Sequence, residues 1–288
     1  MRMTRIATLG IVVAVAGVAL YEVPASPFDH KGVPIRPAAH SSVDPDDSTG
    51  KNSPDGTDAT GDPVAPDPSA KPADQKPGDQ TSASTPGDDS RITYPERGSR
   101  SYAVLPGDPA TIGASGRLMK FQIAVEGGIQ GVDRPAFAEF VRATYGAPQG
   151  WASAGQWRFR QVGPGQPADF QLLLVTPETR DILCGGGPDR YTSCRIGDRV
   201  VLNVARWAHA VPNYGASLTA YRHYMVNHET GHRLGNHHEL CRGPGQPAPV
   251  MEQQTLGLHG CVANSWPYLD GTRYKGRAGQ YNDPVPAS

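Results

Sequence analysis

The chain has 288 residues, of which 34 are glycine and 28 are proline, and only 38% are hydrophobic. Part of such a chain has too few apolar residues to build a core. The formal net charge is −1, and residues 91–288 carry a positive balance of only 5, with no block of Lys or Arg. These values exclude a fibrous repeat and a multi-span membrane protein, and we expect no nucleic-acid partner.

The first 25 residues have the pattern of a secretory signal. A basic start with Arg2 precedes an uncharged apolar stretch at residues 6–20, and a cleavage point is plausible after Ala25. The stretch is shorter than the ~20 residues that a membrane-spanning helix usually needs. We therefore expect residues 1–25 to be a signal peptide, with an uncleaved membrane anchor through residues 6–20 as the alternative. Either way the rest of the chain is expected to be extracytoplasmic, secreted or tethered to the membrane.

Residues 26–98 are expected to form a disordered linker. Between Ser41 and Ser90 there are 11 Asp, no Glu, 3 Lys and no aromatic residue. Such a segment cannot bury enough apolar area to offset its conformational entropy. It is either a spacer that holds the next domain away from a surface or a tail with no specific role.

A single folded domain is expected over residues 99–288, where aromatic and branched residues return. Alternation of apolar and polar residues, or a short apolar run, predicts four strands. These lie at residues 121–126, 157–162, 170–175 and 199–204.

Two helices are predicted among these strands. The first follows Asp133 as N-cap, has Pro135 in its first turn, and closes at Gly146. The second begins after Ser217 and carries apolar residues at three- and four-residue intervals. The order of strands and helices indicates an α/β (α+β) domain with one good core.

The four cysteines, Cys184, Cys194, Cys241 and Cys261, are an even number in an exported chain, which favours disulfides. Three pairings are possible, and we expect the two local ones, Cys184–Cys194 and Cys241–Cys261. A thiolate metal site is the alternative, but the chain has no C-x-x-C spacing.

The segment from Asn227 to Cys241, NHETGHRLGNHHELC, carries the chemistry. Continuing the second helix places His228 and His232 one turn apart on one face, where two imidazoles can reach one Zn²⁺. Glu229 then lies beside the metal rather than on it. Because Zn²⁺ lowers the pKa of a bound water to about 7, a carboxylate there suffices as the base.

Gly235 follows three residues after His232 and can adopt a left-handed conformation that ends the helix and reverses the chain. That reversal brings a third ligand to the metal from outside the helix. The spacing favours His238 for this role, and His237 is the alternative.

The complete spacing H-E-x-x-H-x-x-G-x-x-H resembles the zinc signature of the metzincin metalloproteases. Metzincins have a Met-containing turn under the metal, and Met251, 13 residues after His238, is the candidate for it. Its alternative role is an ordinary core residue. The resemblance implies a metzincin-like zincin domain, a twisted mixed sheet with an active-site helix, and a Zn²⁺ cofactor. The chain also resembles a family of exported bacterial proteins that share this signature and have no assigned substrate.

Some features depart from any single metzincin branch. Gly231 and Leu234 are closest to the matrix-metalloprotease-like branch, whereas Glu239 resembles the astacin branch, in which that residue is structural. Some metzincins place a Tyr two residues after the Met, but here that position is Gln253. No other residue identifies an oxyanion donor, and no cysteine-switch propeptide is present.

We expect a secreted or surface-tethered monomer, and the resemblance implies a zinc metalloendopeptidase that cleaves protein or peptide substrates with Glu229 as general base. An edge strand would align an extended substrate, and residues 199–204 are the candidate. Two alternatives remain: a zinc amidase acting on cell-wall peptide cross-links, and a catalytically idle zinc-bearing envelope module. A purely structural site needs no general base, so Glu229 argues against the second.

Overall fold

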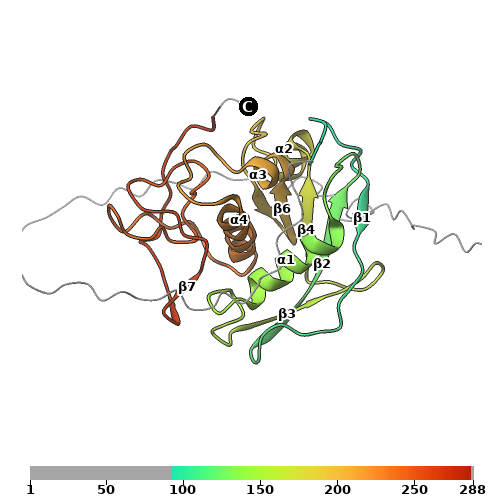
Figure 1. The fold of residues 1–288 in the computed structure, drawn as a ribbon, viewed down its shortest axis with the longest axis horizontal. Helices are drawn as coiled ribbons and strands as arrows, with labels where there is room; N and C mark the ends of the chain where they lie inside the picture. The colour runs from blue at the N-terminus through green and yellow to red at the C-terminus, as the bar shows by residue number, and fades with distance from the viewer. Residues whose placement is uncertain (1–91, 287–288) are drawn as a thin grey trace, which may run out of the picture. The chain divides into compact units, whose positions relative to one another are not determined.

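The computed structural model describes residues 92–286, and these fold around one six-stranded sheet with four helices (Figure 1). The expected signal peptide or anchor and the expected linker up to residue 91 lie outside these residues. The strands are β1 (Tyr102–Val104), β2 (Arg117–Glu126), β3 (Trp157–Gln161), β4 (Phe170–Val175), β5 (Cys194–Ile196), β6 (Arg199–Asn203) and a separate pair, β7 (Tyr268–Leu269) and β8 (Thr272–Arg273). The helices are α1 (Arg134–Gly146), α2 (Pro177–Cys184), α3 (Val204–His209) and α4 (Leu218–Arg233).

The sheet is mixed, as the sequence predicts. Its order is β1-β2-β4-β6-β5, and β3 pairs with the first half of β2. Strands β2, β3, β4 and β6 are parallel, whereas β1 and β5 are antiparallel to their neighbours. The structure therefore belongs to the α+β class that the element order indicates.

The expectation that residues 199–204 form the edge of the sheet is wrong. Strand β6 occupies residues 199–203, and it pairs with β4 on one side and with β5 on the other. The edge is β5, which is only three residues long. A strand that short has no periodicity to detect, so its position could not be predicted.

Successive side chains of the central strands point to opposite faces of the sheet, so the apolar residues form two cores, one on each face. One face of β2 presents Phe121, Ile123 and Val125 to the main core, which also contains residues of α1, α3 and α4. The opposite face contributes Ala124 of β2 and Leu173 of β4 to a smaller cluster under α2. Because side chains of a strand alternate between faces, each central strand serves both cores.

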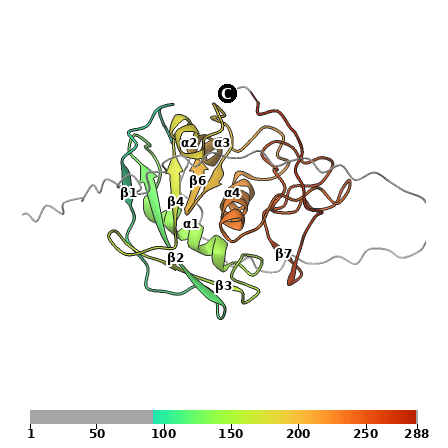
Figure 2. The ribbon, with the colours of Figure 1, turned by 180° about the vertical axis from the view of Figure 1, so that it is seen from behind.

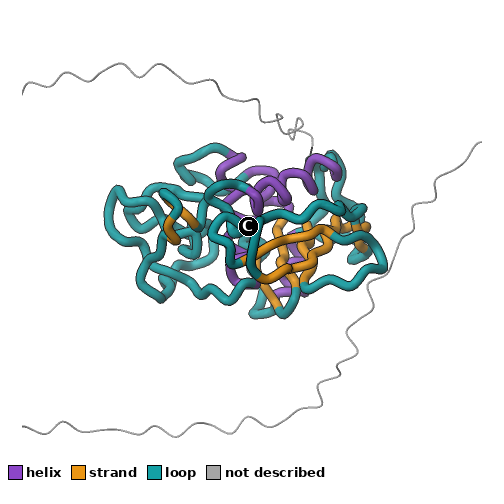
Figure 3. Tube along the Cα trace, turned by 90° about the horizontal axis from the view of Figure 1, so that it is seen from below, coloured by secondary structure: helices purple, strands orange, loops and turns teal. Residues whose placement is uncertain are grey.

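The helix starts agree with the predicted caps. The Asp133 side chain accepts a hydrogen bond from the Ala136 amide (3.0 Å) at the start of α1. Ser217 does the same for Ala220 (3.1 Å) at the start of α4. In Figures 1 and 2, α4 stands between the sheet and the last third of the domain, which Figure 3 shows to be almost wholly loop.

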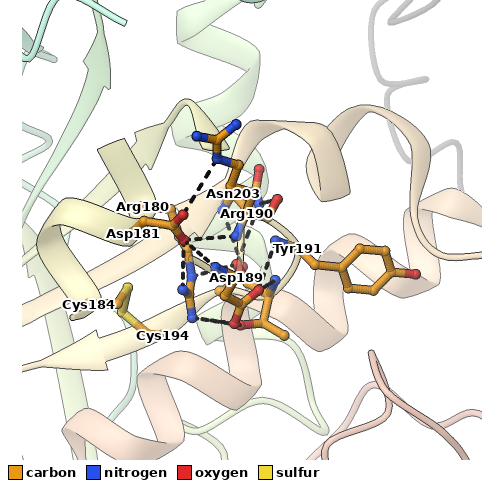
Figure 4. The surroundings of a disulfide bond; sticks show 10 residues. Arg180, Asp181, Cys184, Asp189, Arg190, Tyr191, Cys194 and Asn203 are labelled. Carbon is orange, nitrogen blue, oxygen red and sulfur yellow. Dashed lines mark hydrogen bonds and ion pairs between the residues drawn. A yellow bond between two sulfur atoms is a disulfide. The ribbon is translucent and has the colours of Figure 1, made fainter. Parts of the chain in front are cut away.

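Both predicted disulfides, Cys184–Cys194 and Cys241–Cys261, are present. The first joins the end of α2 to β5, and Figure 4 shows the polar network around it. There the guanidinium of Arg180 contacts the carboxylates of Asp181 (3.0 Å) and Asp189 (2.7 Å). This network fixes the loop that leads into the edge strand. Disulfides are typical of an oxidising environment and so agree with an extracytoplasmic location.

Residues 92–98, which composition assigned to the linker, pack against the domain. Ile92 is buried in the main core, and Thr93 pairs through its backbone with Gln130. A single apolar residue among polar neighbours, such as Ile92, does not indicate from the sequence that a segment belongs to a folded domain. Among the described residues, no helix has both the length and the apolar character to span a membrane.

Candidate metal centre

Helix α4 carries the first half of the histidine segment into the protein interior. His228 and Glu229 are both buried, and His232 follows one turn after His228. The helix ends at Arg233, and Gly235 takes the predicted left-handed conformation (φ +93°). The Asn236 amide then donates to the Gly231 carbonyl (2.9 Å), so the chain turns back beside the helix end.

This reversal brings His238 to the two helical histidines. One ring nitrogen from each of His228, His232 and His238 lies within 4.8 Å of the others. The Nε2 atoms of His232 and His238 are 3.1 Å apart, near the ~3.3 Å expected for two ligands of a tetrahedral zinc ion with Zn–N of about 2.0–2.1 Å. His237, the alternative ligand, is exposed and lies outside this group.

In each of the three histidines, the second ring nitrogen, Nδ1, lies within hydrogen-bonding distance of an oxygen atom. Nδ1 of His228 lies 2.8 Å from the Val250 carbonyl, and Nδ1 of His232 lies 2.9 Å from the Asn236 carbonyl. Nδ1 of His238 lies 2.9 Å from Oε1 of the Gln280 side chain. Since these oxygens only accept, each Nδ1 carries the proton and each Nε2 keeps a free lone pair. This is the outer arrangement that metal-binding histidines have.

The electrostatics of the cluster favour neutral rings. Burial, and then the neighbouring histidines, lower the pKa of His228 well below its usual value and that of His232 to about 4. Burial also lowers the pKa of His238. Neutral imidazole is the form that binds a metal ion, so these residues fit zinc in donor type, number and protonation.

Glu229 faces the same space. Burial raises the pKa of its carboxyl group to about 8, and the guanidinium of Arg180 opposes that shift. A cation held by the three histidines would act in the same direction as Arg180 and favour the carboxylate.

Met251 lies in a tight turn that is hydrogen-bonded through its backbone to the segment after His238. The Glu252 amide donates to the Pro249 carbonyl (2.9 Å), and the Met251 carbonyl accepts from the Glu239 amide (3.1 Å). The Met251 side chain is fully buried. It packs on α4 at Gly231: a Cβ atom there would lie 2.9 Å from Cζ2 of Trp151 and still closer to Sδ of Met251.

Gly231→Ala is expected to destabilise the domain by about 1–3 kcal/mol, because the added methyl group overpacks the contact with Met251. At an open helical position the same change stabilises by about 1 kcal/mol. Urea unfolding of both proteins gives the difference. Combining Gly231→Ala with Met251→Ala should lose less than the sum of the single changes. An increase in stability for Gly231→Ala alone would contradict the packing.

A cavity of about 750 Å³ opens over the histidines and Glu229. The edge strand β5 contributes Cys194 and Arg195 to its lining. Residues 280–283 and Val285 of the C-terminal segment also line it, as does Gln253, two residues after Met251. A cavity of this volume is in the range of ligand-binding pockets, which is about 300–1,000 Å³.

Glu239 has a structural environment, as its resemblance to the astacin branch implies. It is buried, and its carboxylate accepts from Arg273 (3.2 Å) and from the Gly276 amide (3.1 Å). Among the described residues, three histidines lie outside the histidine segment, namely His209, His223 and His259. His223 stacks on Phe140 (4.3 Å between ring centroids), and His259 pairs with Asp283 (2.8 Å).

The sequence does not indicate which oxygen atoms hold the Nδ1 atoms of the three histidines. Asn236 and Val250 act through backbone carbonyls, which carry no residue-type signal. Gln280 lies 42 residues after His238, and nothing in the spacing marks it.

A family model described as "Protein of unknown function (DUF3152)" matches residues 89–264, more than half of the chain. No curated protein and no solved structure matches the chain significantly. The match includes the histidine segment and Met251 but ends before Gln280.

Proposed function

We propose that this chain, which belongs to the DUF3152 family of proteins of unknown function, is an extracytoplasmic zinc-dependent endopeptidase of metzincin type. The observation that carries the proposal is the convergence of three histidine rings, each with its Nδ1 hydrogen-bonded to an oxygen, beside the buried carboxyl group of Glu229. The Met251 turn beneath this group supports the metzincin assignment.

His228, His232 and His238 would hold the metal through their Nε2 atoms. When bound, Zn²⁺ supplies a Lewis acid that polarises the substrate carbonyl and makes a water molecule acidic. Glu229, which lines the cavity next to His228, is placed to accept the proton of the attacking water. It would then donate that proton to the leaving amine as the C–N bond breaks, giving a carboxylate and an amine.

The edge strand would orient the substrate. Strand β5 pairs with β6 on one side only, and its residues Cys194 and Arg195 line the cavity. Backbone groups on its free side can pair with an extended peptide, the common mode of strand addition. A substrate bound in this way would lie between β5 and the C-terminal segment that lines the cavity, next to the three histidines.

The proposal is tested on the full chain, purified under oxidising conditions. We expect about one zinc per chain by mass spectrometry of metals and cleavage of a mixed peptide library. A chelator should abolish cleavage, and added Zn²⁺ should restore it. A folded, zinc-free protein would contradict the proposal. A zinc-loaded protein that cleaves cell-wall cross-links but no peptide would identify the amidase instead, and one that cleaves neither would identify an idle module.

A further inference from the structure

The C-terminal strap, which we define as residues 276–286, runs beside the chain that follows α4. The Leu240 amide donates to the Arg277 carbonyl (2.8 Å), and the Gly279 amide donates to the His238 carbonyl (3.0 Å). Glu239 and Ala278 form an antiparallel bridge between these bonds. The strap therefore pairs along the segment that presents the third histidine.

Close packing fixes the first end of the strap. Gly276 lies so near the Leu240 carbonyl that a Cβ atom would collide with it, and that atom would also lie 2.8 Å from Cγ of Pro249. The Gly276 amide donates to the buried carboxylate of Glu239 (3.1 Å). Only glycine permits this approach, so the position of the strap relative to His238 is set by backbone contact.

A second set of contacts holds the strap beyond Gln280. The Tyr281 ring stacks on His259 with 3.4 Å between centroids, and Nε2 of His259 lies 2.8 Å from the Asp283 carboxylate. His259 belongs to the loop closed by the Cys241–Cys261 disulfide. Gln280 thus lies between two anchored points of the chain.

His238 lies beside the strap, and its Nδ1 atom has a different kind of hydrogen-bond partner from the Nδ1 atoms of the other two histidines. Backbone carbonyls of Val250 and Asn236 hold His228 and His232, whereas His238 is held by a side-chain amide. Oε1 of Gln280 lies 2.9 Å from Nδ1 of His238. Accepting that hydrogen bond selects the tautomer protonated at Nδ1 and turns the ring so that Nε2 faces the other histidines.

We infer that Gln280 is a positioning residue of the metal centre, which orients His238 and fixes its tautomer from the C-terminal strap. The inference rests on the proposed zinc function but concerns the histidine itself, so it has a consequence without metal. Residues beyond the family match, which ends at residue 264, would then be part of the working site.

The test compares four forms of the full chain: wild type, Gln280→Leu, Gln280→Asn and Gln280→Glu. The Leu variant lacks the acceptor, the Asn variant is one methylene too short to reach, and the Glu variant restores an acceptor of the same length. Gln246→Leu is the matched control, because Gln246 is also an exposed glutamine and does not line the cavity. Far-UV circular dichroism verifies that each variant is folded.

The first readout is Co²⁺ and Zn²⁺ affinity by titration. Loss of an outer partner lowers metal affinity by about 10–100-fold. Because Gln280 is exposed and water can replace its oxygen in part, we expect about tenfold weaker binding for the Leu and Asn variants. Gln280→Glu should bind at least as tightly as wild type, and the affinity of Gln246→Leu should equal that of wild type.

The second readout is the tautomer of His238 in metal-free protein, from nitrogen chemical shifts of histidine-labelled samples. Wild type should show the Nδ1-protonated form, and the Leu and Asn variants a mixture. Unchanged tautomer and unchanged affinity in both variants would overturn the inference even if the protein is a zinc peptidase. Conversely, a shifted tautomer in a protein that never hydrolyses a peptide would support the inference and contradict the proposed function.

Discussion

Glu229→Gln should retain zinc and lose hydrolysis. Gln has the shape of Glu but cannot accept and return a proton, and general acid–base catalysis contributes about 10²–10⁴-fold to rate. We therefore expect kcat/KM to fall by about that factor. Zinc content should remain near that of wild type, since Glu229 is not one of the three grouped ligands. Peptide hydrolysis rates and metal content on the same samples provide the comparison.

Glu252→Gln is the matched control for this experiment. Glu252 is also a buried glutamate, and its side-chain oxygens have no hydrogen-bond partner among the described residues, but it does not line the cavity. The same chemical change there should leave turnover within a few fold of wild type. If Glu229→Gln hydrolysed peptides at the wild-type rate, Glu229 would not be the base.

His238→Ala and His237→Ala should have opposite outcomes. His238 contributes one of the three converging nitrogens, and its removal leaves two ligands on a single helix. We expect its zinc affinity to fall by more than the ~10–100-fold that loss of an outer partner causes, and turnover to vanish at ordinary zinc concentration.

His237 is exposed and outside the group, so His237→Ala should keep about one zinc per chain and its activity. Equilibrium dialysis against Zn²⁺ separates the two variants. Zinc loss in His237→Ala with retention in His238→Ala would reverse the assignment of the third ligand.

Local signals allowed much of the fold to be predicted. Strand β4 coincides with the predicted residues 170–175, because a buried apolar run between polar loops has little choice of conformation. The caps at Asp133 and Ser217 were recognisable because they act within three residues of the helix start. The order of His228, His232, Gly235 and His238 predicted their convergence for the same reason, since one helix and one turn fix it.

Features that depend on contacts between residues far apart in the sequence were not predicted. Strand β5 owes its conformation to pairing with β6 and to the Cys184–Cys194 link, not to its own three residues. Gln280 reaches His238 only because Gly276 packs on Leu240. In both cases tertiary structure places a residue whose local sequence is neutral, so no spacing rule could have identified it.

The Cys241–Cys261 bond encloses the Met251 turn and begins three residues after His238. Such a crosslink restricts the unfolded chain, and for a loop of about 15 residues this is worth about 3 kcal/mol. Under reducing conditions the chain would lack this covalent closure around the Met251 turn. The stability of the histidine cluster should therefore depend on the redox state of its surroundings, and a reductant should lower the free energy of unfolding of this region.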